Sequence, residues 1–99
     1  MKPFRLEDAL SVIDAECSEG SVRDINNYAF EFASQEAEML GIDTSSKAFS
    51  ALCQLRRLAL VDECYKSVIG IREDGREGKV KLRFDYEGIP ELIKKQYGK

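Results

Sequence analysis

The sequence predicts a mainly α-helical domain that carries a two-stranded β-hairpin. Apolar residues recur at helical spacing from Leu6 to about Leu58. Residues 79–86 instead alternate strictly between charged and apolar, and Asp74-Gly75 before them is a turn signal. We therefore expect helices over about 5–17, 22–40 and 45–58, strands over about 64–72 and 79–86, and a short C-terminal helix over about 89–97.

Composition indicates one soluble domain without catalytic or metal chemistry. The chain has 99 residues, of which 43% are hydrophobic and 33% charged. No apolar run approaches the about 20 residues needed to cross a bilayer, and no secretory signal is evident, so we expect a cytoplasmic protein with no membrane contact. Cys17, Cys53 and Cys64 are far apart and histidine is absent. We therefore expect no metal, no cofactor and no enzymatic activity, and we interpret the cysteines as small buried residues.

The first two helices follow from periodicity and from residues that stop and start helices. Ser18-Glu19-Gly20 separates them, Ser21 is a candidate N-cap for the second, and Gly41 stands just past its end. The apolar positions of the first are 6, 9, 10, 13 and 17, and those of the second are 22, 25, 29, 32, 33, 37 and 40.

The third helix is expected to end where its periodicity changes. We expect N-capping from Asp43-Thr44-Ser45 and a buried face made of Ala48, Ala51, Leu52, Leu55 and Leu58. The continuous apolar run Leu58-Ala59-Leu60-Val61 is then interpreted as a corner that turns the chain into a strand. Leu52, Leu55 and Leu60 are expected to be largely buried.

The hairpin prediction depends on a period of two. Val80, Leu82, Phe84 and Tyr86 should face inward, and Lys79, Lys81 and Arg83 outward. The partner strand would contain Val68, Ile69 and Ile71, and residues 73–78 would form the turn. A last helix, with Pro90 in its first turn, closes the domain.

Part of this pattern resembles the winged helix-turn-helix domain of small bacterial, archaeal or phage-type regulators. The resemblance rests on Gly41-Ile42-Asp43-Thr44-Ser45, on leucines at 52, 55 and 58, and on the corner Leu58-Ala59-Leu60-Val61. It covers about residues 30–93, and Ala59 departs from the glycine that this family usually has there. The resemblance implies a third helix that lies in the DNA major groove and a wing that contacts the backbone.

Carried over position by position, the resemblance implies a DNA-binding transcriptional regulator that acts as a homodimer. Gln and Arg suit base edges, and Ser, Lys and Arg suit phosphates. The DNA-binding residues would be Ser46, Lys47, Ser50, Gln54 and Arg57 in the helix, and Arg72, Arg76, Lys79, Lys81 and Arg83 in the wing. The dimer surface would be the first or the last helix.

The charge distribution leaves a second hypothesis open. Residues 1–44 contain three basic and ten acidic residues, a net charge of −7, whereas residues 45–83 contain nine basic and five acidic residues, a net charge of +4. The basic part suits double-stranded DNA. Glu73, Asp74 and Glu77, however, would repel phosphates at the wing tip. The alternative is a winged-helix protein-interaction module, an inhibitor or an adaptor without DNA binding, with a partner protein on the acidic N-terminal half.

Overall fold

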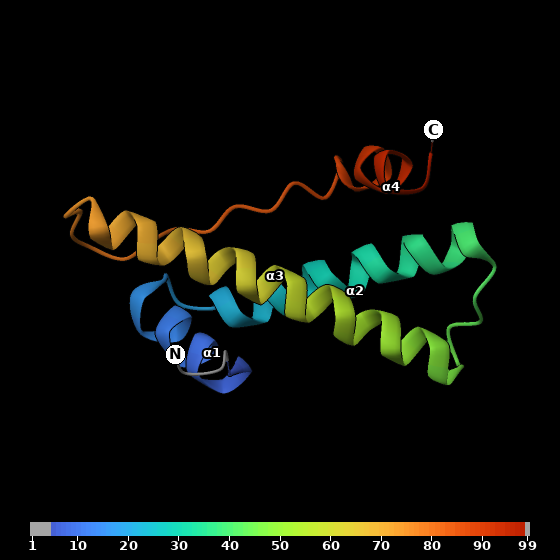
Figure 1. Ribbon diagram of the computed structural model, residues 1–99, viewed down its shortest axis with the longest axis horizontal. Coiled ribbons are helices and arrows are strands. Elements are labelled where there is room, and N and C mark those ends of the chain that lie inside the picture. The colour runs from blue at the N-terminus through green and yellow to red at the C-terminus, as the bar shows by residue number, and fades with distance from the viewer. Residues whose placement is uncertain (1–4, 99) are drawn as a thin grey trace.

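The computed structural model describes residues 5–98, and four α-helices form this part of the chain (Figure 1). They are α1 (Leu6–Glu16), α2 (Ser21–Leu40), α3 (Lys47–Glu73) and α4 (Ile89–Tyr97). Helices α2 and α3 form an antiparallel hairpin, and α1 lies beside the second half of α3 (Figure 1). The chain then returns along α3 in an extended conformation to reach α4 (Figure 1). The result is elongated, with extents of 44 × 27 × 26 Å.

Local signals set the helix ends, and α1, α2 and α4 lie close to the expected ranges. Gly20 and Gly41 flank α2 with φ angles of 85° and 71°, a backbone conformation that favours glycine. The N–H of Ile42 donates to the carbonyl of Ala37 at 2.8 Å and so satisfies the end of α2. The N-cap of α3 is Ser46 rather than a residue of the preceding Asp43–Ser45 run. Its Oγ accepts from the N–H of Phe49 at 3.2 Å.

The core consists of three apolar clusters spaced along the hairpin. The largest joins α1, α2, α3 and Val80; its buried members are Ala9, Ile13, Cys17, Ile25, Val61, Cys64, Val68 and Val80. A second cluster holds α4 against α2 through Phe32, Ile89 and Ile93. A third lies near the loop that connects α2 to α3 and contains Ala33, Ala37 and Phe49. Among residues 5–98, no single cluster runs the full length of the α2–α3 hairpin.

The expected end of the third helix at Leu58 is wrong, because α3 continues to Glu73. The apolar run arises from two faces of one helix. Val61 is buried and Leu60 is half-buried on the inner face, whereas Leu58 and Ala59 are exposed on the outer face. When both faces are apolar, a helix loses its 3.6-residue signature and resembles a buried strand. The expected strand over 64–72 is helical for the same reason.

The β-hairpin, and with it the winged fold, is also wrong, although the mainly α class agrees. Residues 79–86, here named the return segment, are extended, but the only β contact among residues 5–98 is an isolated parallel bridge between Cys17 and Val80. Asp74-Gly75 ends α3 instead of turning a hairpin. Gly75 has φ 78°, and its N–H donates to the carbonyl of Arg72 at 3.0 Å.

The expected alternation within the return segment is confirmed for most positions. Val80 is buried and Leu82 and Phe84 are half-buried, whereas Lys79, Lys81 and Arg83 are exposed. Tyr86 is the exception, because it is also exposed. The period of two therefore predicts the extended conformation of this segment correctly. The partner strand that we inferred from it is absent from residues 5–98.

Candidate functional site

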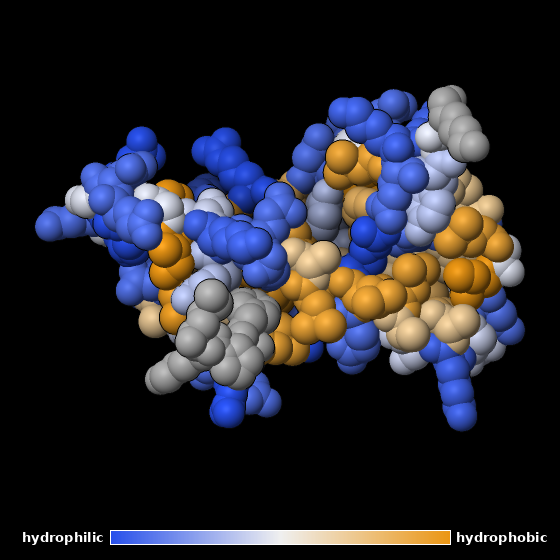
Figure 2. Space-filling view, viewed as in Figure 1, coloured by the Kyte–Doolittle hydropathy of each residue, from blue (hydrophilic) through white to orange (hydrophobic). Residues whose placement is uncertain are grey.

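The outer side of α3 carries an exposed apolar stripe. Its members are Ala48, Ala51, Leu55 and Leu58, here named the outer stripe. Leu55 is 64% exposed and Leu58 41% exposed, so the expectation that this face is buried is wrong. Leu52 and Leu60, which were also expected in the core, are half-buried. Figure 2 shows apolar side chains that run from the middle of the molecule to the end where α2 and α3 connect.

The spacing of the outer stripe is that of a helix-pairing surface. Positions 48, 51, 55 and 58 are separated by three, four and three residues, the a/d pattern of a heptad repeat. The next position in that series is Asp62, which forms an i,i+4 ion pair of 3.0 Å with Lys66. The apolar part of the stripe therefore covers the first half of α3 and ends at a charged pair.

A buried polar cluster joins α2, α3 and α4. The Glu36 carboxylate is fully buried, and its Oε1 accepts from Nε of Arg56 at 2.6 Å. The second carboxylate oxygen accepts from Nη2 of Arg56 and from the hydroxyl of Tyr97. The Arg56 guanidinium lies over the Phe32 ring, 4.6 Å from its centroid. Each carboxylate oxygen thus has a partner, and the arrangement fits a structural crosslink between three helices.

The electrostatics of the cluster also favour a charged carboxylate. Burial alone would raise the pKa of Glu36, but the hydrogen bonds from Arg56 and Tyr97 outweigh it and hold the pKa below its ordinary value. The hydrogen bond to Glu36 raises the pKa of Tyr97, which keeps the hydroxyl proton available for donation. Glu36 is therefore a fixed anion rather than a proton carrier near neutral pH.

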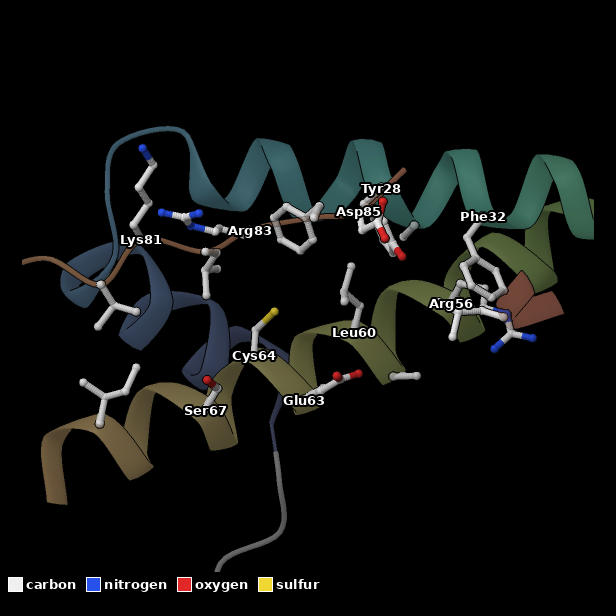
Figure 3. A pocket seen from close by; sticks show the side chains of 17 residues that line it. Tyr28, Phe32, Arg56, Leu60, Glu63, Cys64, Ser67, Lys81, Arg83 and Asp85 are labelled. Carbon is white, nitrogen blue, oxygen red and sulfur yellow. The ribbon is translucent and has the colours of Figure 1, made fainter. Parts of the chain in front are cut away.

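A pocket of about 510 Å³ opens between α3 and the return segment (Figure 3). Leu60 and Cys64 point into it from α3, and Phe32 and Arg56 lie at one end (Figure 3). Its charged lining residues are of both signs: Arg56, Glu63, Lys81, Arg83 and Asp85. Because the charges are mixed and the lining is largely apolar, the pocket itself indicates no particular small ligand.

The candidate DNA-binding residues of the third helix lie at the first half of α3. Ser46 is occupied as the N-cap. Lys47, Ser50 and Gln54 are exposed on one side of α3, next to the outer stripe. Arg57 continues this side, but it is half-buried, and its Nε donates to Oδ1 of Asn26 on α2 at 2.7 Å.

The candidate wing residues do not form one basic surface. Arg72 bonds to Glu16 of α1 at 2.5 Å and to the carbonyls of Arg76 and Gly78 at 2.7 Å each, so it fastens the chain after α3. Lys79 donates to the carbonyl of Ala15.

The other three cations of this set are exposed. Arg76 lies in the loop after α3, and Lys81 and Arg83 line the pocket beside Arg56. Gln54 and Arg57 instead line a separate hollow with Asn26 and Phe30. The two halves of the expected DNA surface therefore lie on different sides of the α2–α3 hairpin.

The sequence interpretation missed the outer stripe and the Glu36 cluster. The stripe had a signal, since an apolar run at Leu58–Val61 is what a helix with two apolar faces produces. Glu36 had none, because a carboxylate in a helix that is rich in acids looks like any surface residue.

Residues 5–98 contain neither a cluster of metal-binding side chains nor a membrane-spanning helix. No group of histidine, cysteine or carboxylate side chains there could hold a metal ion. No helix in this range is both long enough and apolar enough to cross a membrane. Comparison with family models, with curated proteins and with solved structures finds no match to this chain.

Proposed function

We propose that this protein is a helical protein-interaction module that binds an amphipathic helix of another protein along the outer stripe of α3. The observation that carries the proposal is the exposed, uncharged a/d series Ala48, Ala51, Leu55 and Leu58. Helices that pair side by side use this spacing, and the small alanines allow close approach at one end of the seam. The two leucines supply the apolar area that a partner would remove from water.

The chemistry of the partner follows from what surrounds the stripe. The seam is apolar for about three turns and then meets the Asp62–Lys66 pair. A matching helix carries apolar residues at i, i+3, i+7 and i+10, and polar residues where it passes Asp62 and Lys66. This is the adaptor or inhibitor class of function, here without a winged fold.

The experiment places a photo-crosslinking residue at Leu55 and, as a control, at Glu31 on the exposed side of α2. In cells of the source organism, position 55 should capture one protein that position 31 does not. A synthetic peptide from the crosslinked region should then bind the purified chain as a helix. Leu55→Glu should weaken that binding by at least about tenfold, which is about 1.4 kcal/mol, and Glu31→Gln should leave it unchanged. Equal capture at both positions, or peptide binding that ignores Leu55, would contradict the proposal.

DNA binding is the second candidate, and one observation favours it. Lys47, Ser50 and Gln54 share an exposed side of α3 that carries no carboxylate and continues to Arg57. Double-stranded DNA would meet this side and the outer stripe without help from a wing. A gel-shift series against random duplex should then show affinity that falls with salt by a log–log slope of about −0.9 per phosphate contacted. Gln54→Ala should weaken binding, and failure to retard duplex in low salt would exclude this candidate.

A further inference from the structure

The return segment has backbone groups that form no backbone–backbone hydrogen bond within residues 5–98. The N–H of Val80 donates to the carbonyl of Glu16 at 2.8 Å, and its carbonyl accepts from Ser18 at 2.9 Å. The next backbone pairing along the chain is from Ile89 to Tyr86 at 3.3 Å. Within residues 5–98, no backbone–backbone hydrogen bond involves residues 81–85. Five consecutive extended residues thus present a strand edge.

The protein core holds this strand in its conformation. Leu82 and Phe84 are half-buried against the largest apolar cluster, which joins α1, α2 and α3. The centroid of the Phe84 ring lies 5.2 Å from that of the Tyr28 ring. Lys81, Arg83 and Asp85 are exposed. The inward side chains therefore fix the register, and a pairing strand would not have to order the segment first.

The outward charges of the segment are self-complementary. Positions 83 and 85 are Arg and Asp, so a cation and an anion flank Phe84 symmetrically, before the turn that begins at residue 86. An antiparallel second copy centred on Phe84 places Arg83 opposite Asp85, and this pair occurs twice. Opposite charges on facing strands attract, whereas a copy centred on Arg83 would set two guanidinium groups against each other.

We propose that two copies of this chain associate through residues 82–86 as an antiparallel two-stranded ribbon centred on Phe84. The second copy is the occupant because the charge sequence matches its own reverse, whereas a uniformly acidic or basic strand would match only half of it. Phe84 meets Phe84 and Leu82 meets Tyr86, which are pairs that stabilise facing strands. The ribbon uses a different surface from the outer stripe, so the two proposals are independent.

Charge exchange tests both the interface and its register. Arg83→Asp sets Asp against Asp85, and Asp85→Arg sets Arg against Arg83. In sedimentation equilibrium, the wild-type chain should dimerise, and each variant alone should dimerise about ten- to a hundredfold more weakly, because two attractive pairs become repulsive. The double variant should recover the wild-type dissociation constant, and an equimolar mixture of the two single variants should form a heterodimer. Circular dichroism controls for folding, since Oδ1 of Asp85 also accepts from the Gly88 N–H at 3.1 Å.

Hydrogen exchange tests the backbone pairing without any substitution. Amides of residues 82–85 should exchange rapidly in dilute wild-type protein and slowly when it is concentrated, whereas amides in the middle of α2 should not depend on concentration. A wild-type chain that stays monomeric at high micromolar concentration would overturn the proposal. So would a dimer that Arg83→Asp leaves intact, or a double variant that fails to recover while it remains folded. Leu55→Glu should weaken peptide binding and leave the dimer intact. Failure of the dimer proposal can therefore be distinguished from failure of the proposed function.

Discussion

Helices α2 and α3 lie against each other, yet their outer sides differ in chemistry. Most exposed residues of α2 are polar or charged, among them Asp24, Asn27, Glu31 and Glu38. The exposed apolar residues of α2 are Phe30, whose ring packs edge-to-face against Phe49 of α3, and Met39 and Leu40 at its last turn. The exposed side of α3 presents the alanines and leucines of the outer stripe. Packing within the chain explains the inner faces of both helices, but it gives no reason for leucine at a position that is 64% exposed. The difference is therefore one of arrangement: the exposed apolar residues of α3 form a continuous row at helix-pairing spacing, and those of α2 do not.

The largest expected effect distinguishes the two faces of α3. Phe49 is buried in the cluster near the α2–α3 loop, and Phe49→Ala should lower the free energy of unfolding by about 3–5 kcal/mol through lost burial and the cavity that remains. Leu55→Ala removes a side chain that is mostly in water, so its effect should stay within about 0.5 kcal/mol. Urea denaturation measures both. Similar losses for the two variants would show that the outer stripe belongs to the core.

A second prediction compares an inner with an outer carboxylate on α2. Glu36→Gln leaves the Arg56 charge without its partner and should cost about 2–4 kcal/mol, reduced from the value for fully buried pairs because Arg56 is 21% exposed. Glu31→Gln on the exposed side should change the free energy of unfolding by less than about 0.5 kcal/mol. Thermal denaturation at neutral pH provides the comparison. If the Glu31 variant lost as much stability as the Glu36 variant, the crosslink would have no special role.

The same pair of variants predicts a pH dependence. The pKa of Glu36 is lowered in the folded chain from its ordinary 4.5, so its contribution to stability is complete above that pH and is lost as the pH falls through the folded-state pKa. The wild-type protein should therefore be more stable than Glu36→Gln above about pH 4.5, and this difference in the free energy of unfolding should disappear as the pH falls through the folded-state pKa. Melting temperatures across an acid series test this. An advantage that persists undiminished at the acid end would contradict the assignment.

A smaller effect concerns the attachment of α4. Tyr97→Phe removes the hydrogen bond to the Glu36 carboxylate but keeps the ring, and should cost about 1–2 kcal/mol. The control is Tyr86→Phe, because Tyr86 is exposed and its ring contacts only Tyr28 among the described aromatic pairs. If the two variants lost the same free energy of unfolding, the Tyr97 hydroxyl would contribute no more than an exposed hydroxyl, and Tyr97 would hold α4 through its ring alone.

The smallest perturbation is chemical labelling of thiols. Burial raises the pKa of Cys64 to about 11, and it also raises the pKa values of Cys17 and Cys53. Cys53 is only half-buried, so a thiol reagent at mildly alkaline pH should modify it first and reach Cys17 and Cys64 only after unfolding. Mass spectrometry of a labelling time course reads the order directly. Early modification of Cys64 would mean that the cluster around α1 is open.

The sequence predicts those parts of the fold in which each element has one apolar face. Helices α1, α2 and α4 have such faces and clear end signals, so their periodicity is informative. The strict alternation of the return segment predicts its extended conformation. A period of two fixes which side chains face inward, but it does not show whether a strand lies beside them.

The prediction failed where α3 carries apolar residues on two sides. The sequence interpretation assigned Leu55 and Leu58 to the core, because an apolar residue is usually inside and no feature around Leu55 marks it as exposed. The resemblance to a winged domain then reinforced a helix end at Leu58. For the candidate site, the polar side Lys47–Gln54 could be predicted, whereas the Glu36–Arg56–Tyr97 cluster depends on contacts between residues as far as 61 positions apart.

The division of the core into three clusters also sets how the molecule opens. Helix α4 is held by the small cluster of Phe32, Ile89 and Ile93 and by Tyr97, and it makes no contribution to the α1 cluster. We therefore expect α4 to detach while the α1–α3 packing stays in place, with a lower opening free energy than global unfolding. Such an opening would expose the Glu36–Arg56 pair to water while the α2–α3 hairpin persists, so the C-terminal helix would serve as a reversible cover on this buried carboxylate.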